Sequence, residues 1–196
     1  MNLPNKLTIF RIILVPIMVM IPFLGIQGDF LRIPIEYWII NGIFILASLT
    51  DKVDGYLARK NNQVTTFGKF LDPLADKILV LAAMMMLVEM TKLPAWIPIV
   101  VLAREFLVSG YRLLAVEKGG KVIAASKWGK IKTVTQVIAI ILAFMDVYRF
   151  GDCFTGILHG WDFAFNLVMT SMMLIQIIAT VFSGVDYLKG AKEFIK

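Results

Sequence analysis

Long apolar segments alternate with short polar connections along most of this 196-residue chain. The apolar segments cover about 7–24, 34–59, 68–90, 94–116, 133–145 and 163–182, and the fifth extends back by a helical turn or two toward Trp128. Runs of this length and hydropathy are typical of membrane-spanning helices. The pattern therefore predicts an all-α membrane protein with six transmembrane helices.

The connections carry the polar residues. At the start, apolar Leu3 and Leu7 stand among polar Asn5 and Lys6, a mixture that suits a short interfacial segment before the first span. The opening has only two basic residues before apolar sequence and no small-residue cleavage site, so we expect it to be retained rather than removed as a signal peptide. We expect 25–32 to form a turn and 146–162 to form a polar loop.

Composition supports a membrane protein. Hydrophobic residues make up 59% of the chain and the mean hydropathy is +0.79, far above the values of soluble domains. The length corresponds to one domain, which we expect to cover residues 1–196. The single Cys153 excludes an intrachain disulfide.

The distribution of basic residues predicts the orientation in the membrane. Six spans place both termini on one side, and only Arg32, Lys92 and Arg149 of the 20 Lys and Arg then fall on the other side, leaving 17 with the termini. Cytoplasmic loops carry the excess of Lys and Arg. We therefore expect both termini, and a polar cavity at the ends of these spans, to face the cytoplasm.

Four carboxylates lie between the second and third apolar segments. Asp51 and Asp54 are three residues apart, and Asp72 and Asp76 are four apart, so each pair lies on one face of its helix. The polar stretch 59–68 suits a turn between antiparallel helices, which brings the two pairs side by side. Ionised Asp beside apolar segments is costly unless a cation or a water-filled cavity receives it.

The ligand chemistry of this cluster indicates hard metal ions. Its ligands are oxygen atoms alone, with no nearby His or Cys, which favours Mg²⁺ or Mn²⁺. Two such ions form a clamp for phosphoryl chemistry. If the Asp residues only capped or solvated helix ends, the small residues Gly55, Ala58 and Gly68 would have no explanation, whereas a ligand close to the backbone needs them. A cation transporter with intramembrane Asp is a further alternative, but it gives no reason for these small residues.

The complete pattern is Asp51-x-x-Asp54-Gly55-x-x-Ala58-Arg59, eight residues, then Gly68-x-x-x-Asp72-x-x-x-Asp76. It resembles the signature of the CDP-alcohol phosphotransferase family, with every position matched. The resemblance implies that a CDP-linked lipid or alcohol is the donor and that CMP leaves. It also implies two bound cations, Mg²⁺ or Mn²⁺, and a homodimer.

The same resemblance assigns roles to residues. Asp51, Asp54 and Asp72 would be metal ligands, and Asp76 would be both a metal ligand and the general base on the acceptor hydroxyl. Residues implied to bind the CDP-lipid are Asn5, Thr8, Arg11, Gly55, Ala58, Arg59 and Gly68. For the first three, a role as interfacial anchors is an open alternative.

Basic residues farther along the chain predict a site for an acceptor phosphate. Arg104 and Arg112 are eight residues apart and fall within about 80° of each other on a helix. Cations within or beside a membrane span are costly, so we expect them to face a cavity and an anion. Lys127 and Lys130 stand at the start of the next span and would add to this pocket, or would bind anionic lipid headgroups instead.

Three segments, 4–11, 104–112 and 125–133, are similar to those of the branch of the family that makes phosphatidylglycerophosphate in bacteria. This resemblance implies a reaction of CDP-diacylglycerol with sn-glycerol 3-phosphate, giving phosphatidylglycerophosphate and CMP, at the bacterial cell membrane. A related phospholipid synthase with another acceptor, such as inositol phosphate, shares the core signature, so the identity of the acceptor stays open.

Overall fold

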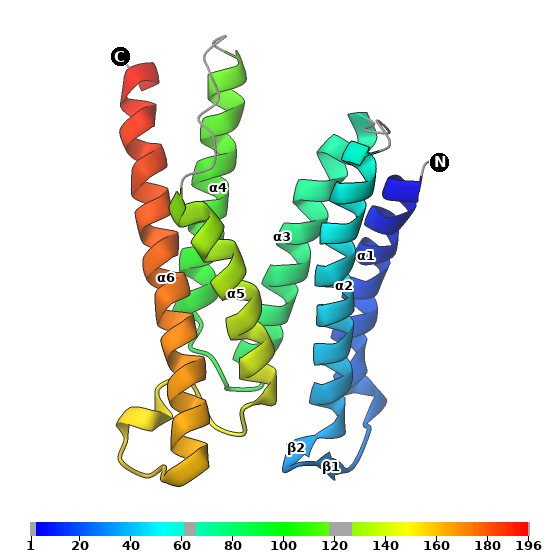
Figure 1. Ribbon diagram of the computed structural model, residues 1–196, viewed down its shortest axis with the longest axis vertical. Coiled ribbons are helices and arrows are strands. Elements are labelled where there is room, and N and C mark those ends of the chain that lie inside the picture. The colour runs from blue at the N-terminus through cyan, green and yellow to red at the C-terminus, as the bar shows by residue number, and fades with distance from the viewer. Residues whose placement is uncertain (1–2, 61–65, 118–126, 196) are drawn as a thin grey trace. The chain divides into compact units, whose positions relative to one another are not determined.

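The computed structural model describes residues 3–60, 66–117 and 127–195 of the chain. Side chains are described at 5–50, 71–112 and 128–189. Six α-helices make up most of this part: α1 Leu3–Met20, α2 Ile35–Lys60, α3 Thr66–Glu89, α4 Trp96–Glu117, α5 Lys127–Met145 and α6 Gly160–Ile195 (Figure 1). The predicted all-helical class is confirmed.

The connections contain four short elements. They are the 3₁₀ helices η1 (Ile21–Leu24) and η2 (Asp152–Phe154), and the strands β1 (Asp29–Phe30) and β2 (Ile33–Pro34), which pair antiparallel in a tight hairpin before α2. Trp38, one turn into α2, donates its indole N–H to the carbonyl of Phe30 at 3.0 Å and so fastens the hairpin to the helix.

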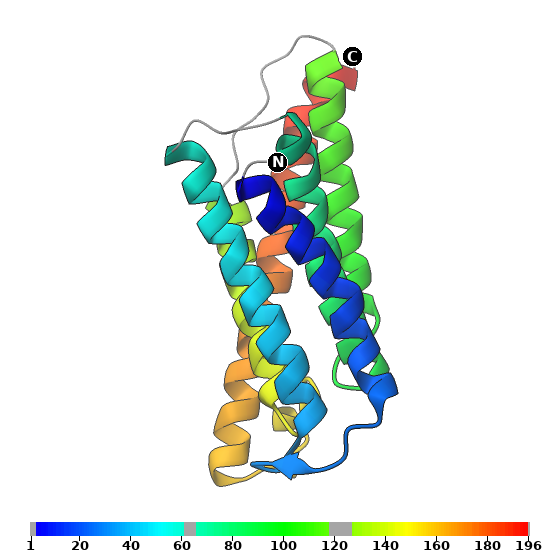
Figure 2. The same ribbon diagram turned by 90° about the vertical axis from the view of Figure 1, so that its right-hand side faces the viewer.

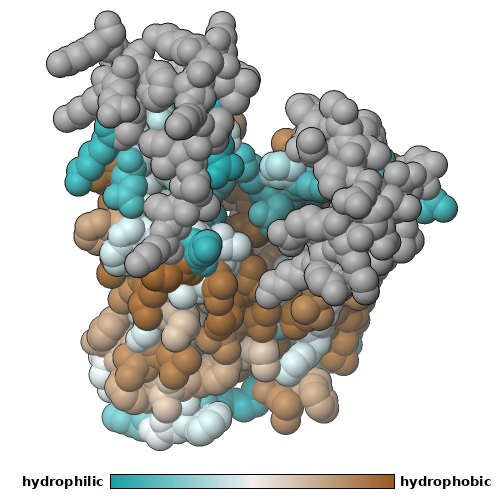
Figure 3. Space-filling model, turned by 45° about the horizontal axis from the view of Figure 1, so that its top comes forward, coloured by the Kyte–Doolittle hydropathy of each residue, from teal (hydrophilic) through white to brown (hydrophobic). Residues whose placement is uncertain are grey.

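Three helical segments of the described chain are long and apolar enough to cross a membrane: Asn5–Leu24, Trp128–Met145 and Gly160–Lys189. A shorter apolar stretch, Ile35–Thr50, lies in α2. In α3 and α4, charged residues interrupt the apolar sequence, and these include the predicted site residues. Apolar side chains cover much of the surface visible in Figure 3, as expected for contact with lipid.

The chain divides into two compact units. The first comprises residues 1–92 and 141–147, and the second comprises 93–140 and 148–196. In the first unit, α1 packs against both α2 and α3, and Figure 2 shows it running beside them. Met18, Phe44, Leu79 and Leu87 are fully buried there. Between helices in a membrane, side chains of this kind stabilise the unit through close van der Waals packing rather than through removal from water.

Helix α1 differs from the prediction at its start. The N-terminal stretch is not a separate interfacial element, because the helix is continuous from Leu3 to Met20. No Gly or Pro occurs between residues 5 and 15 to break it. The helix gives way to η1 at Ile21, beside Pro22, and Gly25 closes that turn in the left-handed conformation with φ 60°.

In the second unit, α4 packs against α6. Val108 and Tyr111 of α4 form a buried cluster with Tyr187 of α6. The start of α5 lies against α6 as well, since the rings of Trp128 and Phe182 stack with centroids 5.0 Å apart.

Helix α6 is also longer than predicted, because it continues through the basic tail to Ile195. The polar residues in its first turns hold the preceding loop. Asn166 accepts a hydrogen bond from the backbone N–H of Cys153 at 2.8 Å and donates one to the carbonyl of Arg149 at 2.9 Å. These bonds satisfy backbone groups that burial would otherwise leave unpaired.

The loop of residues 146–162, which we expected to be polar, also contains apolar residues, some of them buried and some exposed. Cys153 and Leu158 are buried, whereas Phe154, Ile157 and Trp161 are among the most exposed apolar residues, with Trp161 81% exposed. Trp at the end of a span suits the membrane–water interface.

A buried lysine ties three elements of the first unit together. Lys92, between α3 and α4, is 6% exposed, and its ammonium group donates to the carbonyl of Asp146 just after α5. The same nitrogen lies 4.9 Å from the ring centroid of Tyr37 near the start of α2. Burial lowers the pKa of Lys92 to about 8, although the nearby Asp146 charge opposes this shift.

Candidate active site

Helices α2 and α3 carry the two aspartate pairs. Asp51 and Asp54 lie in the last turns of α2, and Asp72 and Asp76 lie early in α3. The two helices are in contact and run in opposite directions (Figure 1), as the sequence predicts. The side chains of six predicted site residues of this region lie outside the described part: Asp51, Asp54, Gly55, Ala58, Arg59 and Gly68. That the four carboxylates converge stays a prediction.

Asp72 is held by a residue of another helix. The hydroxyl of Thr8 in α1 donates to Asp72 Oδ1 at 2.5 Å. Asp72 and Asp76 are both half-buried, and Ala75 between them is fully buried. The two carboxylates thus lie along one side of α3 at a spacing of four residues, one of them fixed by α1.

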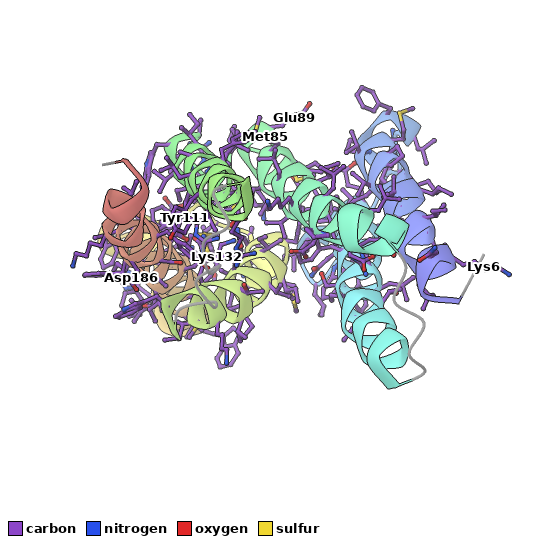
Figure 4. The ribbon with its side chains drawn as sticks, turned by 90° about the horizontal axis from the view of Figure 1, so that it is seen from above. Lys6, Met85, Glu89, Tyr111, Lys132 and Asp186 are labelled. Carbon is purple, nitrogen blue, oxygen red and sulfur yellow. The ribbon has the colours of Figure 1, made fainter. Side chains whose placement is uncertain are left out.

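The predicted α1 residues share one buried face. Asn5, Thr8 and Arg11 follow one another at intervals of three, and Arg11 is 0% exposed. Lys6, in contrast, is exposed and extends outward in Figure 4. A guanidinium enclosed among helices is costly unless anionic or polar groups surround it. The polar face of α1 is therefore directed at neighbouring helices, and a role of these residues in binding the CDP-lipid stays a prediction.

The described part of the aspartate site fits a hard divalent cation. Asp72, Asp76 and Thr8 offer only oxygen atoms, the donor type that Mg²⁺ and Mn²⁺ prefer. Within the residues described, no group of three or more His, Cys, Asp or Glu side chains comes together. A complete ligand set would therefore need Asp51 and Asp54 of α2 as well.

The second candidate group lies within the second unit, on α4, α5 and α6. Arg104 Nη1 donates to Glu105 Oε1 at 2.8 Å, and Lys132 Nζ donates to the same oxygen at 2.8 Å. Arg104 Nη2 donates to the hydroxyl of Ser183 at 2.5 Å. Figure 4 shows Lys132 and Tyr111 directed into the space among the three helices. The predicted phosphate-binding Arg104 is thus part of a buried polar cluster.

Tyr187 of α6 brings the two predicted arginines to one aromatic ring. Its ring centroid lies 5.7 Å from Cζ of Arg104 and 5.7 Å from Cζ of Arg112. Arg112 Nη2 also donates to the Tyr187 hydroxyl at 3.0 Å. Tyr111 meets the same ring edge-on, with centroids 6.0 Å apart. Arg104 is half-buried and Arg112 is exposed, so these cation–π contacts contribute about 0.5–1 kcal/mol at the exposed end and more at Arg104.

One atom of this cluster has an unused hydrogen. Arg104 Nε is buried, and the described residues supply no hydrogen-bond partner for it. A buried donor without a partner costs about 1–3 kcal/mol. Nε and the neighbouring Nη2 form one edge of the guanidinium, the Nε edge of Arg104, and the two N–H groups of such an edge match the spacing of two oxygens of a phosphate.

The structure places the lysines at the start of α5 differently, and it adds Ser183 and Tyr187, which the sequence did not single out. Lys132 is buried against Glu105, whereas Lys130 is exposed on α5, and the side chain of Lys127 lies outside the described part. Ser183 and Tyr187 come from the last helix, four residues apart. Their polar side chains in an apolar span were the available signal.

Comparison of the sequence with known proteins shows the family of this chain. The family model described as CDP-alcohol phosphatidyltransferase matches residues 1–182. This protein belongs to the CDP-alcohol phosphatidyltransferase family, whose members depend on divalent metal ions.

Several relatives in this family carry the same enzyme name. The chain is 43% identical over 180 residues, 83% of this chain and 93% of the relative, to the CDP-diacylglycerol–glycerol-3-phosphate 3-phosphatidyltransferase of Bacillus subtilis. It is 36% identical over 195 residues to the protein of that name from Haemophilus influenzae, covering 97% of this chain and 94% of the relative. The relative from Rickettsia felis, also of that name, is 34% identical over 194 residues, covering 98% and 97%.

Proposed function

We propose that this protein transfers the phosphatidyl group of CDP-diacylglycerol to a hydroxyl of sn-glycerol 3-phosphate, forming phosphatidylglycerophosphate and CMP. The names of the relatives that match nearly the whole chain support this reaction. The observation that carries the choice of a phosphorylated acceptor is the buried edge of Arg104, which suits a phosphate and leaves a neutral alcohol without a matching charge.

The bonding changes are simple. The acceptor hydroxyl oxygen bonds to the phosphorus that carries diacylglycerol, and the bond from that phosphorus to the bridging oxygen of the diphosphate breaks. CMP leaves with that oxygen. Asp76, half-buried on α3, takes the proton of the attacking hydroxyl. Thr8 keeps the neighbouring Asp72 carboxylate in a fixed orientation, so the group does not turn away as charge develops.

Asp51, Asp54, Asp72 and Asp76 would hold two divalent cations, Mg²⁺ or Mn²⁺. When bound, such ions neutralise the diphosphate and stabilise the departing phosphate. The buried α1 face of Asn5, Thr8 and Arg11 would contribute to binding of the CDP-lipid, as would Gly55, Ala58, Arg59 and Gly68. The oxygen-only donors of the described part support this ligand chemistry.

The acceptor phosphate would be bound by the Arg104 edge with help from Arg112. A guanidinium offers parallel N–H groups that match two phosphate oxygens. Lys127 and Lys130, at the start of α5, would add positive charge near this group. The excess of Lys and Arg on the side that holds the termini supports a cytoplasmic active site. The chain would form six spans and one catalytic domain in a bacterial cell membrane and would pair as a homodimer, as the family resemblance implies.

Release of CMP from CDP-diacylglycerol by the purified protein tests this function. We expect release with sn-glycerol 3-phosphate and Mg²⁺ or Mn²⁺, and none after addition of a chelator. Glycerol, inositol phosphate and serine serve as comparison acceptors. Activity with inositol phosphate and none with glycerol 3-phosphate would overturn the acceptor assignment, and metal uptake into proteoliposomes without CMP release would favour a transporter.

A further inference from the structure

Glu105 is a buried carboxylate shared by two cations. Arg104 and Lys132 donate to the same oxygen, Oε1, each at 2.8 Å. The three side chains are only 9–17% exposed. Arg104 and Glu105 come from α4, and Lys132 comes from α5, so one carboxylate oxygen links two helices.

The carboxylate is needed to keep the two cations close together. Like charges that share a small volume of low dielectric repel strongly, and an opposite charge between them removes this cost. The three groups together carry a net charge of about +1, from two cations and one anion. Without Glu105, the Arg104 and Lys132 side chains would separate, and the orientation of both would be lost.

The direction of the Arg104 guanidinium depends on these bonds. Glu105 holds Nη1, Ser183 of α6 holds Nη2, and the Tyr187 ring lies 5.7 Å from Cζ. The aliphatic part of the side chain lies beside Gly184 of α6, where an added Cβ would make an ordinary contact with Arg104 Cγ at 3.6 Å. With both Nη groups anchored, Nε is the guanidinium nitrogen of Arg104 for which the described residues supply no hydrogen-bond partner.

We propose that Glu105 is a positioning residue for the acceptor phosphate: it fixes Arg104 and Lys132 around one oxygen so that the Nε edge of Arg104 points at the ligand. This inference rests on the proposed function. Glu105 itself carries the same sign of charge as a phosphate and does not bind it. Its effect is on recognition of the acceptor, through the arrangement of the cations.

The test is the variant Glu105→Gln, which keeps the shape of the side chain and removes the charge. We expect the KM for glycerol 3-phosphate to rise about tenfold or more, because hydrogen bonds to charged groups contribute about 1.5–3 kcal/mol and about 1.4 kcal/mol is a factor of ten. The KM for CDP-diacylglycerol should stay within about twofold. Glu105→Asp, which keeps the charge on a shorter side chain, should give a smaller increase.

Asp186→Asn is the matched control, since Asp186 is an exposed acid of the same region of the second unit, on α6 (Figure 4). It should leave both KM values unchanged. A Glu105→Gln protein with an unchanged acceptor KM would overturn the proposal. Equal increases in the KM of donor and acceptor would also overturn it, because they would indicate a general loss of structure.

A double variant separates positioning from simple charge balance. The double variant Glu105→Gln/Lys132→Met removes one of the two cations together with the carboxylate, so only Arg104 is left without its partner. The thermal midpoint should therefore recover relative to that of Glu105→Gln. We expect the acceptor KM to stay raised. If the double variant regains the wild-type KM, Glu105 only neutralises Lys132 and the proposal fails.

The wild-type protein distinguishes this failure from failure of the proposed function. If it releases CMP with another phosphorylated acceptor in place of glycerol 3-phosphate, the acceptor assignment falls, and the same Glu105 variants are measured with that acceptor. If it accepts no phosphorylated alcohol at all, both proposals are overturned.

Discussion

The hydroxyl of Thr8 donates to Asp72 Oδ1 at 2.5 Å, joining α1 to α3 across 64 residues of sequence. Thr8 is 1% exposed, so water does not compete for this bond. A carboxylate that binds a metal is commonly oriented by a second hydrogen bond of this kind. If Asp72 binds a metal ion as proposed, this contact makes α1 a support for the proposed metal ligands of α3.

Replacement of Thr8 by Val should weaken metal binding. The change removes the hydroxyl at nearly constant volume, and loss of an outer hydrogen bond costs about 10–100-fold in metal affinity. The Mn²⁺ concentration for half-maximal activity should therefore rise at least about tenfold. Direct Mn²⁺ titration by electron paramagnetic resonance should show the same shift.

The conservative variant Thr8→Ser keeps the hydroxyl and should bind Mn²⁺ like the wild type. Thr135→Val is a second control, since the Thr135 hydroxyl bonds only to nearby carbonyls of its own helix at 2.8 and 3.3 Å. If Thr8→Val binds Mn²⁺ normally, the hydrogen bond has no role in the metal site.

Asp76 and Asp54 should respond differently to conversion to Asn. Asp76→Asn removes the proposed general base, so turnover should disappear while binding of CDP-diacylglycerol falls only modestly. Asp54→Asn removes a proposed metal ligand alone, so Mn²⁺ binding and CDP-lipid binding should weaken together. Isothermal titration of each variant checks this, and equal losses of binding in both would contradict the assigned roles.

Arg104→Ala should impair use of the acceptor. Removing the guanidinium takes away the proposed phosphate contact, so the KM for glycerol 3-phosphate should rise by about 10–100-fold, corresponding to 1.5–3 kcal/mol for charge-assisted hydrogen bonds. Steady-state kinetics with each substrate varied in turn provide the measurement. An effect on the donor KM alone would be inconsistent with an acceptor site at Arg104.

Lys92 predicts a pH dependence of stability. Its pKa is about 8 in the folded protein and 10.5 ordinarily. Between these values the folded form binds fewer protons than the unfolded form, so the free energy of unfolding should rise with pH, by about 3 kcal/mol in total. Below pH 8 both forms are protonated, and Lys92 contributes no slope.

Thermal unfolding in detergent from pH 7 to 10 would measure this dependence. Lys92→Met provides the reference, because it keeps an apolar stem of similar length without a titrating group. The wild-type midpoint should increase relative to that of Lys92→Met as the pH rises above 8. A constant difference between the two proteins across this range would show that Lys92 titrates normally.

The sequence predicted the helices well because hydropathy and helix breakers act locally. The contact between α2 and α3 follows from two apolar segments that are separated by a polar stretch of sequence. The sequence did not predict the continuous α1 or the long α6, because the boundary of a helix depends on capping and packing rather than on hydropathy alone.

For the candidate site, motif spacing predicted which helices carry the site residues, but not which contacts between helices hold those residues in place. The helical period predicts that Arg104 and Arg112 lie on the same face of α4. Their shared contact with Tyr187 depends instead on how α6 packs against α4, which the sequence does not show. Lys132 rather than Lys130 reaches Glu105 because two residues along α5 turn a side chain by about 200° around the helix axis. Packing between segments far apart in sequence decides such details.

The burial of Cys153 has a practical consequence. It is the only cysteine in the sequence and is 5% exposed, with its backbone N–H held by Asn166. Thiol reagents should modify it only when the segment around η2 opens, so the rate of labelling reports local unfolding there. Cysteines introduced elsewhere for spin labels or fluorophores would react first, and the native thiol could be left in place.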